Sequence, residues 1–278
     1  MHTSLYHKRM SRNEFLSLQE GRTRFEISGQ GPRVVLIHGM TAPLHVWDPT
    51  VKALNEAGFQ TLRYDLFGRG DSDRPKKAYT LDLLYRQLTE LLEKQKTESP
   101  LHLIAFSWGC GLAAYFTDRH PDRVRKMIFL APGGLPHLYQ KSFGIMKTPL
   151  LGEVILGLFG NRSLLQDTKK TFLYPERFPE FYERFQKQLK RPGYGRAFLS
   201  TLRNTPSDFT KIYRDLGQRR KEILLLWGKE DRKVPVENAV RFEELLPGAT
   251  TLTFDDAGHA VHWDRQEEVD RAIQTFLS

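Results

Sequence analysis

The sequence contains a single cysteine, Cys110, so no intramolecular disulfide can form. It also lacks an uninterrupted apolar run long enough to span a bilayer, and we therefore expect no transmembrane segment. Residues 1–10 hold no apolar stretch like the core of a signal peptide. Together these absences are consistent with a reducing compartment, and we expect a cytoplasmic protein.

Recognisable metal-binding and nucleic-acid-binding motifs are missing as well. No histidine or cysteine spacing is typical of a zinc site, and we expect the chain to need no metal or cofactor. The formal net charge is +9, but no nucleic-acid-binding motif accompanies it, so we expect no nucleic-acid partner. An anionic membrane or an acidic protein would be other partners for such a charge.

What is present is the composition of a globular protein, with 278 residues, 40% hydrophobic and 27% charged. Apolar β-branched runs alternate with segments of helical periodicity, which predicts an α/β fold with a mainly parallel β-sheet flanked by helices. We interpret residues 1–20 as a mobile or helical extension and residues 24–27 as an edge strand. The predicted strands are 33–37, 59–64, 101–106, 127–131, 222–228 and 250–254, and the predicted helices are 47–57, a segment after Thr80, 108–119, 237–245 and 264–277.

The alternation stops at Gly133 and resumes after Asp215. Between these positions the sequence shows helix-like segments with several aromatic residues and breaks at Pro149, Pro175, Pro192 and Pro206, but no strong strand. We therefore expect a core made of residues 1–133 and 216–278. Residues 134–215 are predicted to form an inserted α-helical lid over the site.

Ser107 lies between small residues at the end of a predicted strand, in Ala105-Phe106-Ser107-Trp108-Gly109. A strand that turns sharply into a helix lifts the intervening side chain above the sheet, and small flanking residues let the two elements approach closely. The pattern is the small-x-Ser-x-small form of a nucleophile elbow, although a serine before a helix is also an ordinary N-cap.

A serine hydroxyl becomes a good nucleophile when a base takes its proton and an acid orients that base. Asp231 follows the predicted strand 222–228, and His259 follows the predicted strand 250–254. The order Ser, Asp, His along the chain agrees with a catalytic triad. Glu230 is a rival acid and His262 a rival base, while we interpret His38 and Asp65 as structural residues.

These pieces together resemble the α/β-hydrolase superfamily over nearly the whole chain outside the lid. The resemblance implies a triad of Ser107, Asp231 and His259, with backbone amides of Met40 and Trp108 forming the oxyanion hole. The matching segments are Leu36-Ile37-His38-Gly39, Tyr64-Asp65-Leu66-Phe67-Gly68-Arg69-Gly70-Asp71-Ser72, the elbow, His120-Pro121-Asp122-Arg123-Val124, Gly228-x-x-Asp231 and Ala257-Gly258-His259.

Within this superfamily, serine at the elbow argues against the dehalogenase and epoxide hydrolase branches, which carry aspartate there. We therefore expect a carboxylic ester hydrolase (a carboxylesterase) that works through an acyl-enzyme. One alternative is a carbon–carbon bond hydrolase of meta-cleavage type, which shares the fold and the triad. Another is a hydrolase-like ligand-binding protein with little turnover.

The predicted lid carries most of the positive charge, with 14 lysines and arginines against seven acids between Gly133 and Asp215. A solvated helical surface is the simplest explanation. A sharper hypothesis is that the lid docks an acidic acyl carrier protein. Biotin-pathway esterases that cleave the methyl ester of pimeloyl-acyl carrier protein resemble this plan. An interrupted apolar stretch lies between Phe143 and Phe159. We consider three roles for it: packing within the lid, lining an acyl pocket, or resting on an anionic membrane.

Overall fold

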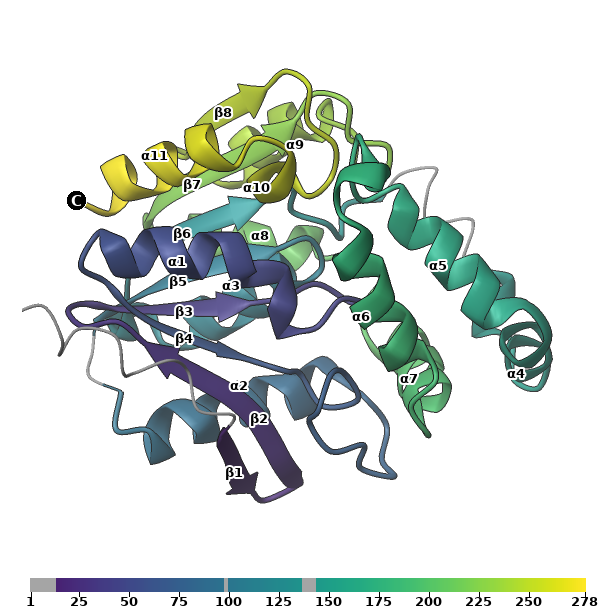
Figure 1. Cartoon of the computed structure of the whole chain (residues 1–278). Helices are drawn as coiled ribbons and strands as arrows, with labels where there is room; N and C mark the ends of the chain where they lie inside the picture. The colour runs from purple at the N-terminus through teal and green to yellow at the C-terminus, as the bar shows by residue number, and fades with distance from the viewer. Residues whose placement is uncertain (1–13, 98–99, 137–143) are drawn as a thin grey trace, which may run out of the picture.

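A twisted sheet of eight strands runs through the middle of the molecule (Figure 1). The computed structural model describes residues 14–97, 100–136 and 144–278. The strand order is β1-β2-β4-β3-β5-β6-β7-β8, and all neighbours are parallel except at β1 and β2. The predicted α/β fold is confirmed. The strands are β1 (Glu14–Leu18), β2 (Gly21–Ser28), β3 (Arg33–Ile37), β4 (Gln60–Tyr64), β5 (Leu101–Phe106), β6 (Val124–Leu130), β7 (Glu222–Gly228) and β8 (Thr250–Phe254).

Helices cover both faces of this sheet, which is why the central strands are apolar on both sides. All six side chains of β5 are buried, for example. On one face α1 packs beside α11, and on the other α3 packs between α2 and α8 (Figure 1). The helices of the core are α1 (Asp48–Glu56), α2 (Leu81–Lys94), α3 (Gly109–Arg119), α8 (Thr210–Gly217), α9 (Asn238–Leu245), α10 (Val261–Asp264) and α11 (Gln266–Leu277).

The start of the described chain differs from the sequence prediction. Residues 14–18 were expected in an extension and instead form strand β1, which pairs antiparallel with β2. β1 is therefore the edge strand, and the segment predicted as an edge, residues 24–27, lies one strand further in. Pairing with β2 supplies the backbone hydrogen bonds of β1, and only Leu18 of its side chains is buried. Such a strand leaves little hydrophobic pattern in the sequence. Residues 1–13 lie outside the described part.

Helix α2 begins as the sequence predicts, because the Thr80 hydroxyl accepts a hydrogen bond from the backbone N–H of Leu83. The helical periodicity predicts Gln87 on the polar face of this helix, and that prediction is wrong. Gln87 is buried, accepts from the N–H of Phe67 and donates to Thr23 and to the carbonyl of Asp65. A buried glutamine that satisfies backbone groups of a distant loop leaves no signal in helical periodicity.

The segment between β6 and β7 forms an insert that projects from the carboxyl ends of the strands (Figure 1). The described residues of this segment contain helices and no strand. They have a hydrophobic cluster of their own, which includes Phe185, Phe198 and Leu202. Helix α8, at the end of the predicted lid, packs against α3 of the core. The elements of the insert are η4 (Ile145–Lys147), α4 (Leu151–Ile155), the π-helical turn η5 (Leu156–Gly160), α5 (Asn161–Lys169), η6 (Pro175–Arg177), α6 (Pro179–Leu189) and α7 (Tyr194–Asn204).

Within the residues that the structure describes, no helix is both long and apolar enough to cross a membrane.

Candidate active site

Ser107 occupies a sharp turn between β5 and α3. Its φ angle of +55° lies in the left-handed region, which is costly for a residue other than glycine and is commonly found at functional sites. The turn depends on Gly109, because a Cβ at that position would lie 2.4 Å from the carbonyl oxygen of His38. Helix α3 can therefore begin directly against the end of β3, and the serine side chain is lifted above the sheet.

Asp231 and His259 reach Ser107 from the loops that follow β7 and β8. The Ser107 hydroxyl donates to Nε2 of His259 at 2.9 Å, and the Nδ1–H of His259 donates to Oδ2 of Asp231 at 2.7 Å. An ionised carboxylate only accepts hydrogen bonds, so Nδ1 carries the hydrogen and Nε2 is free to take the serine proton. The structure thus brings together the three residues proposed from the sequence.

The other oxygen of Asp231 is held by the backbone. Oδ1 accepts from the N–H groups of Lys233 at 2.8 Å and Val234 at 2.9 Å, which fixes the carboxylate before it meets the imidazole. The neighbouring acid, Glu230, instead accepts from the N–H of Ala257 at 3.0 Å. Of the two acids considered from the sequence, only Asp231 hydrogen-bonds to His259.

His262 is turned away from Ser107. Its Nε2–H donates to the carbonyl of Val46 at 3.0 Å, and its ring packs against Trp47 and Phe106. Burial lowers the pKa of His262 to about 3, so its imidazole is neutral and remains so at physiological pH. This environment suits a packing residue.

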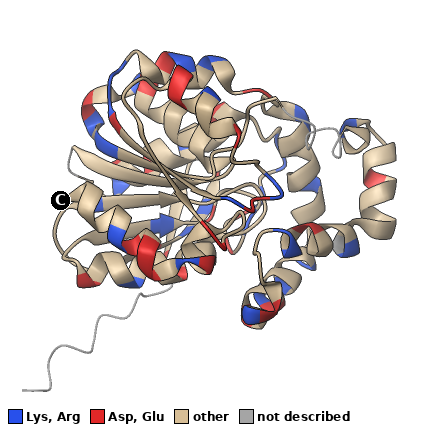
Figure 2. Ribbon diagram, turned by 90° about the horizontal axis from the view of Figure 1, so that it is seen from above, with Lys and Arg blue, Asp and Glu red and all other residues tan. Residues whose placement is uncertain are grey.

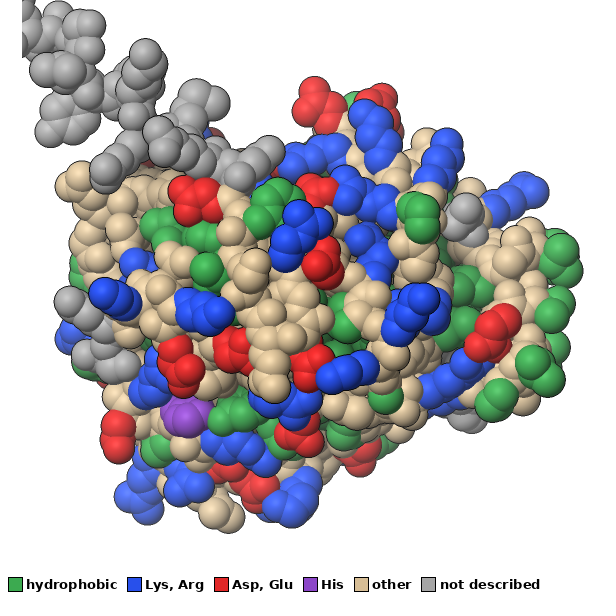
Figure 3. All heavy atoms as spheres, turned by 90° about the horizontal axis from the view of Figure 1, so that it is seen from below, with side chains coloured by type: hydrophobic (Ala, Val, Ile, Leu, Met, Phe, Trp, Pro, Cys, Tyr) green, Lys and Arg blue, Asp and Glu red, His purple; other side chains and the backbone are tan. Residues whose placement is uncertain are grey.

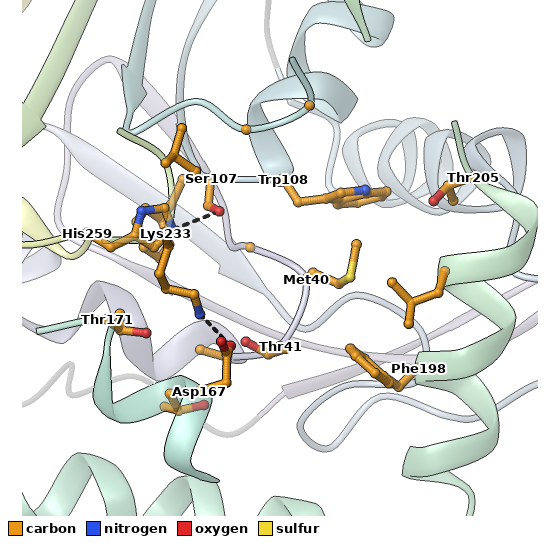
Figure 4. A pocket seen from close by; sticks show the side chains of 18 of the residues that line it. Met40, Thr41, Ser107, Trp108, Asp167, Thr171, Phe198, Thr205, Lys233 and His259 are labelled. Carbon is orange, nitrogen blue, oxygen red and sulfur yellow. Dashed lines mark hydrogen bonds and ion pairs between the residues drawn. The ribbon is translucent and has the colours of Figure 1, made fainter. Parts of the chain in front are cut away.

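Met40 and Trp108 line the same pocket as Ser107 and His259. Met40 belongs to the loop that follows β3, and Trp108 comes directly after the serine. The two residues predicted to supply oxyanion-hole amides therefore lie on the serine side of the site (Figure 4). Their side chains contribute to the pocket wall.

Buried polar side chains brace the loops around Ser107. His38 donates from Nδ1 to the carbonyl of Gly39 and accepts at Nε2 from the N–H of Leu66, and burial lowers its pKa to about 3. Asp65 accepts from the N–H groups of Leu44 and Asp71, and burial raises its pKa to about 6. Both residues hold strand ends in place.

Arg69 and Gln188 are site-supporting residues that the sequence did not reveal. The Nε of Arg69 donates to the carbonyl of Met40 at 2.8 Å, and its Nη1 donates to Oγ1 of Thr201 at 3.0 Å. Gln188 donates to the carbonyl of Thr41 and accepts from the N–H of Gly70. Arg69 is fully buried, and burial lowers its pKa. These bonds tie the insert to the loop after β3.

The pocket lies between the core and the insert and is mostly apolar. In Figure 4, Ser107 and His259 meet at one end, and Phe198 and Thr205 lie at the other. Two lysines line it. Nζ of Lys233 contacts Oδ2 of Asp167 at 2.8 Å, whereas Lys147 of the insert is half-buried at the pocket wall. Across the described ranges no cluster of histidine, cysteine or acidic side chains could hold a metal ion.

The fold and the site define the class of the protein. A family model of the alpha/beta hydrolase fold matches residues 32–266, and the chain belongs to that family. The resemblance found in the sequence motifs is thereby confirmed at the level of the superfamily, and the protein is a hydrolase.

Relatives with assigned names cover almost the full length of the chain. A 2-hydroxy-6-oxononadienedioate/2-hydroxy-6-oxononatrienedioate hydrolase of Cupriavidus pinatubonensis is 28% identical, with 95% of each chain covered. The protein of the same name from Escherichia coli K12 is 25% identical, with 96% of each covered.

Solved structures agree in fold. A bromoperoxidase from Bacillus anthracis superimposes with a TM-score of 0.80 at 23% identity, covering 96% of this chain and 99% of that one. A thermophilic esterase from Thermogutta terrifontis gives a TM-score of 0.78 at 21% identity, with 97% and 98% covered. A mutant of a meta-cleavage product hydrolase from Pseudomonas fluorescens also gives 0.78 at 21% identity, with 95% and 97% covered.

Proposed function

We propose that this protein is a serine hydrolase with Ser107 as nucleophile, His259 as general base and Asp231 as the residue that orients the imidazole. The observation that carries the proposal is the chain of two hydrogen bonds from the Ser107 hydroxyl through His259 to a backbone-anchored carboxylate. Ser107 Oγ attacks a carbonyl carbon, and its proton passes to Nε2 of His259. Water later releases the acid from the acyl-enzyme.

The negative charge that develops on the carbonyl oxygen is stabilised by the backbone N–H groups of Met40 and Trp108. Such a preset donor contributes about 2.7–4 kcal/mol, by analogy with the removal of one donor in another serine hydrolase. Both residues line the pocket beside the serine. No step of this mechanism calls for a metal or a cofactor.

We further propose that the bond cleaved is a carbon–carbon bond, as in the meta-cleavage type of reaction. Support comes from the relatives, which are named as 2-hydroxy-6-oxononadienedioate/2-hydroxy-6-oxononatrienedioate hydrolases and are 25–28% identical over nearly the full chain. This alternative has more support than ester hydrolysis, the first expectation from the sequence.

In a 2-hydroxy-6-oxo acid the enol can tautomerise to a ketone at C2. After Ser107 adds to C6, the C5–C6 bond breaks, and the electron pair left on C5 is delocalised through the double bond to the C2 oxygen. His259 returns its proton to the leaving fragment. Hydrolysis of the acyl-enzyme then gives a carboxylic acid, so that one water is consumed per bond broken.

Ester hydrolysis remains a second candidate because of the charges in the pocket. A dienedioate carries two carboxylates, yet of the two lysines that line the described pocket, Lys233 already pairs with Asp167. One lysine, Lys147, then remains to meet an anionic substrate. The rest of the lining is largely apolar and suits an acyl chain.

The test has two parts. An activated fluorophosphonate probe should label the wild-type protein and fail to label Ser107→Ala. The kcat/KM of the untreated wild-type enzyme is then compared for a 2-hydroxy-6-oxo-dienoate and for p-nitrophenyl esters of increasing acyl length. Faster cleavage of the dienoate supports carbon–carbon hydrolysis, and faster cleavage of the esters reverses the order of the two candidates.

If the wild-type protein is folded but is neither labelled by the probe nor active on either substrate, the third hypothesis is favoured, a hydrolase-like ligand-binding protein with little turnover. The more specific expectation of a pimeloyl-acyl carrier protein methyl ester, with an acidic carrier protein docked on the basic insert, stays a prediction. A preference for the carrier-bound ester over the free ester that weakens with salt would support it.

A further inference from the structure

The outer end of the insert carries an unusual concentration of exposed apolar side chains. Six of the nine exposed large hydrophobic residues in the described chain fall between residues 145 and 159. We call this surface the apolar tip, and Figure 3 shows hydrophobic side chains gathered along the outer edge of the insert. The tip consists of Ile145, Leu150, Leu151, Val154, Leu158 and Phe159, which are 46–81% exposed.

The tip is not needed to hold its own helix in place. Gly152, Leu156 and Gly160 form the inward face of α4 and η5. A Cβ on Gly152 would lie 2.2 Å from the carbonyl oxygen of Met146, and one on Gly195 of α7 would lie 2.7 Å from Leu156. The inward face is thus closely packed on α7. A helical segment that is apolar on both faces requires a second apolar environment, such as a protein core or a membrane.

Leu150 adds an observation of a different kind. Its φ angle is +66°, a conformation that costs free energy for a side chain with a Cβ, and 81% of its surface is exposed. The turn therefore presents a large apolar side chain outward at an energetic cost. Leu150 is the N-cap of α4, and its backbone bonds to Val154 and to the Glu153 side chain while its own side chain stays exposed.

The charges around the tip indicate which apolar environment it meets. Figure 2 shows the outermost helical segment almost free of charged residues. The acid within it, Glu153, is bonded to Arg203. Beside it, Arg162 and Lys190 flank a shallow hollow between α5 and α6, and neither forms an ion pair with the described residues. Apolar side chains rimmed by free cations suit an anionic lipid surface.

A second copy of the chain is a poorer fit to the same surface. The insert carries 14 basic residues against seven acids, so two inserts meeting tip to tip would repel each other. An anionic membrane accepts both the apolar side chains and the cations around them. Figure 1 also shows α4 at the far end of the insert, where a flat surface can reach it.

We propose that the apolar tip docks this protein on an anionic membrane, with Leu150, Leu158 and Phe159 entering the interface and Arg162 and Lys190 lying at the headgroups. η4, which carries Ile145 of the tip, also contributes Lys147 to the candidate active site, so docking brings the pocket near the lipid. The inference does not depend on which bond the enzyme cleaves.

The experiment is sedimentation of the full chain with vesicles of phosphatidylglycerol and phosphatidylcholine, compared with vesicles of phosphatidylcholine alone. The wild type should bind the anionic vesicles more tightly and lose affinity as salt rises. The triple variant Leu150→Ser, Leu158→Ser, Phe159→Ser should bind at least about tenfold more weakly. Val240→Ser, which removes a comparably exposed apolar side chain on α9, should leave binding unchanged.

Arg162→Glu combined with Lys190→Glu should weaken binding to the anionic vesicles and remove its salt dependence. Unchanged thermal unfolding of each variant shows that the fold is retained, because exposed substitutions rarely alter stability by more than about 0.5 kcal/mol. The proposal is overturned if the wild type ignores anionic vesicles or the triple variant binds them equally well. It is also overturned if the wild type is a dimer that the triple substitution makes monomeric.

Discussion

Asp231 is held at both oxygens, by His259 at one and by two backbone N–H groups at the other. Asp231→Asn keeps the shape and an acceptor for those amides. Its amide would donate to Nδ1 of His259 and so force the hydrogen onto Nε2, where it blocks proton transfer from Ser107. We expect kcat to fall by about 10⁴, as for the corresponding change in a characterised serine protease. Steady-state kinetics on the faster of the two substrate classes measures the effect.

Glu230→Gln is the matched control for this change. Glu230 is the adjacent acid, and its side chain bonds to the N–H of Ala257 and not to His259. We expect its kcat to stay within about threefold of the wild type, since surface changes rarely cost more than about 0.5 kcal/mol. Equal losses in the two variants would argue that Asp231 has no special part in orienting His259.

The residues around Ser107 differ in how visible they are in the sequence. Ser107, Asp231 and His259 each follow a segment that could be predicted as a strand, so their positions at the carboxyl ends of a parallel sheet could be predicted too. The contact of Lys233 with Asp167 joins residues 66 positions apart and depends on how the insert folds back. Nothing in the local pattern around either residue indicates the other.

Among the elements, the loop after β3 and helix α7 of the insert are linked through Arg69. Its guanidinium bonds the carbonyl of Met40 and the hydroxyl of Thr201, 132 positions away. Arg69→Met would leave the Met40 carbonyl unsatisfied and free the loop that carries a proposed oxyanion donor. We expect kcat to fall by about 10²-fold with KM nearly unchanged, because small displacements at a reacting centre have effects of this size.

Thr201→Val separates this positioning role from general stability. It removes the link to α7 but leaves the bond from Arg69 to Met40, so kcat should change much less than in Arg69→Met. Thermal unfolding of both variants reports their stability. If kcat is normal in Arg69→Met while stability falls, Arg69 acts only as a structural residue.

The core elements and the insert also differ in how far the sequence predicts them. Most strands of the parallel sheet are apolar runs, and all six predicted strand segments end within one residue of the observed strand, five of them at the same residue. The predictions for residues 14–18 and for Gln87 were wrong. Strand β1 forms because it pairs with β2, and Gln87 is buried because it bonds to a distant loop. In the insert, helices could be expected but their packing on the core could not.

The whole molecule buries several ionisable groups, and their pKa values make stability depend on pH. Burial lowers the pKa of His38, His45 and His262 to about 3, so each stays neutral in the folded state and takes up a proton on unfolding below about pH 6.5. Burial raises the pKa of Asp65 and Asp270 to about 6. These two carboxyl groups bind protons more readily in the folded state, so they increase stability as the pH falls from about 6 to 4. The histidines are more numerous, so stability should fall as the pH drops below 6.5.

His45→Leu isolates one of these contributions. His45 is buried and its ring packs edge-on against Phe181, a contact that an apolar side chain can replace. The pKa of such a histidine is about 3 in the folded state and about 6.5 in the unfolded state. It therefore lowers the free energy of unfolding by about 2 kcal/mol as the pH falls from 7 to 5, at about 1.36 kcal/mol per pH unit. Over that pH interval the free energy of unfolding of the variant should therefore fall by about 2 kcal/mol less than that of the wild type. Urea unfolding at the two pH values measures it, and identical losses in both proteins would mean that His45 does not take up a proton on unfolding.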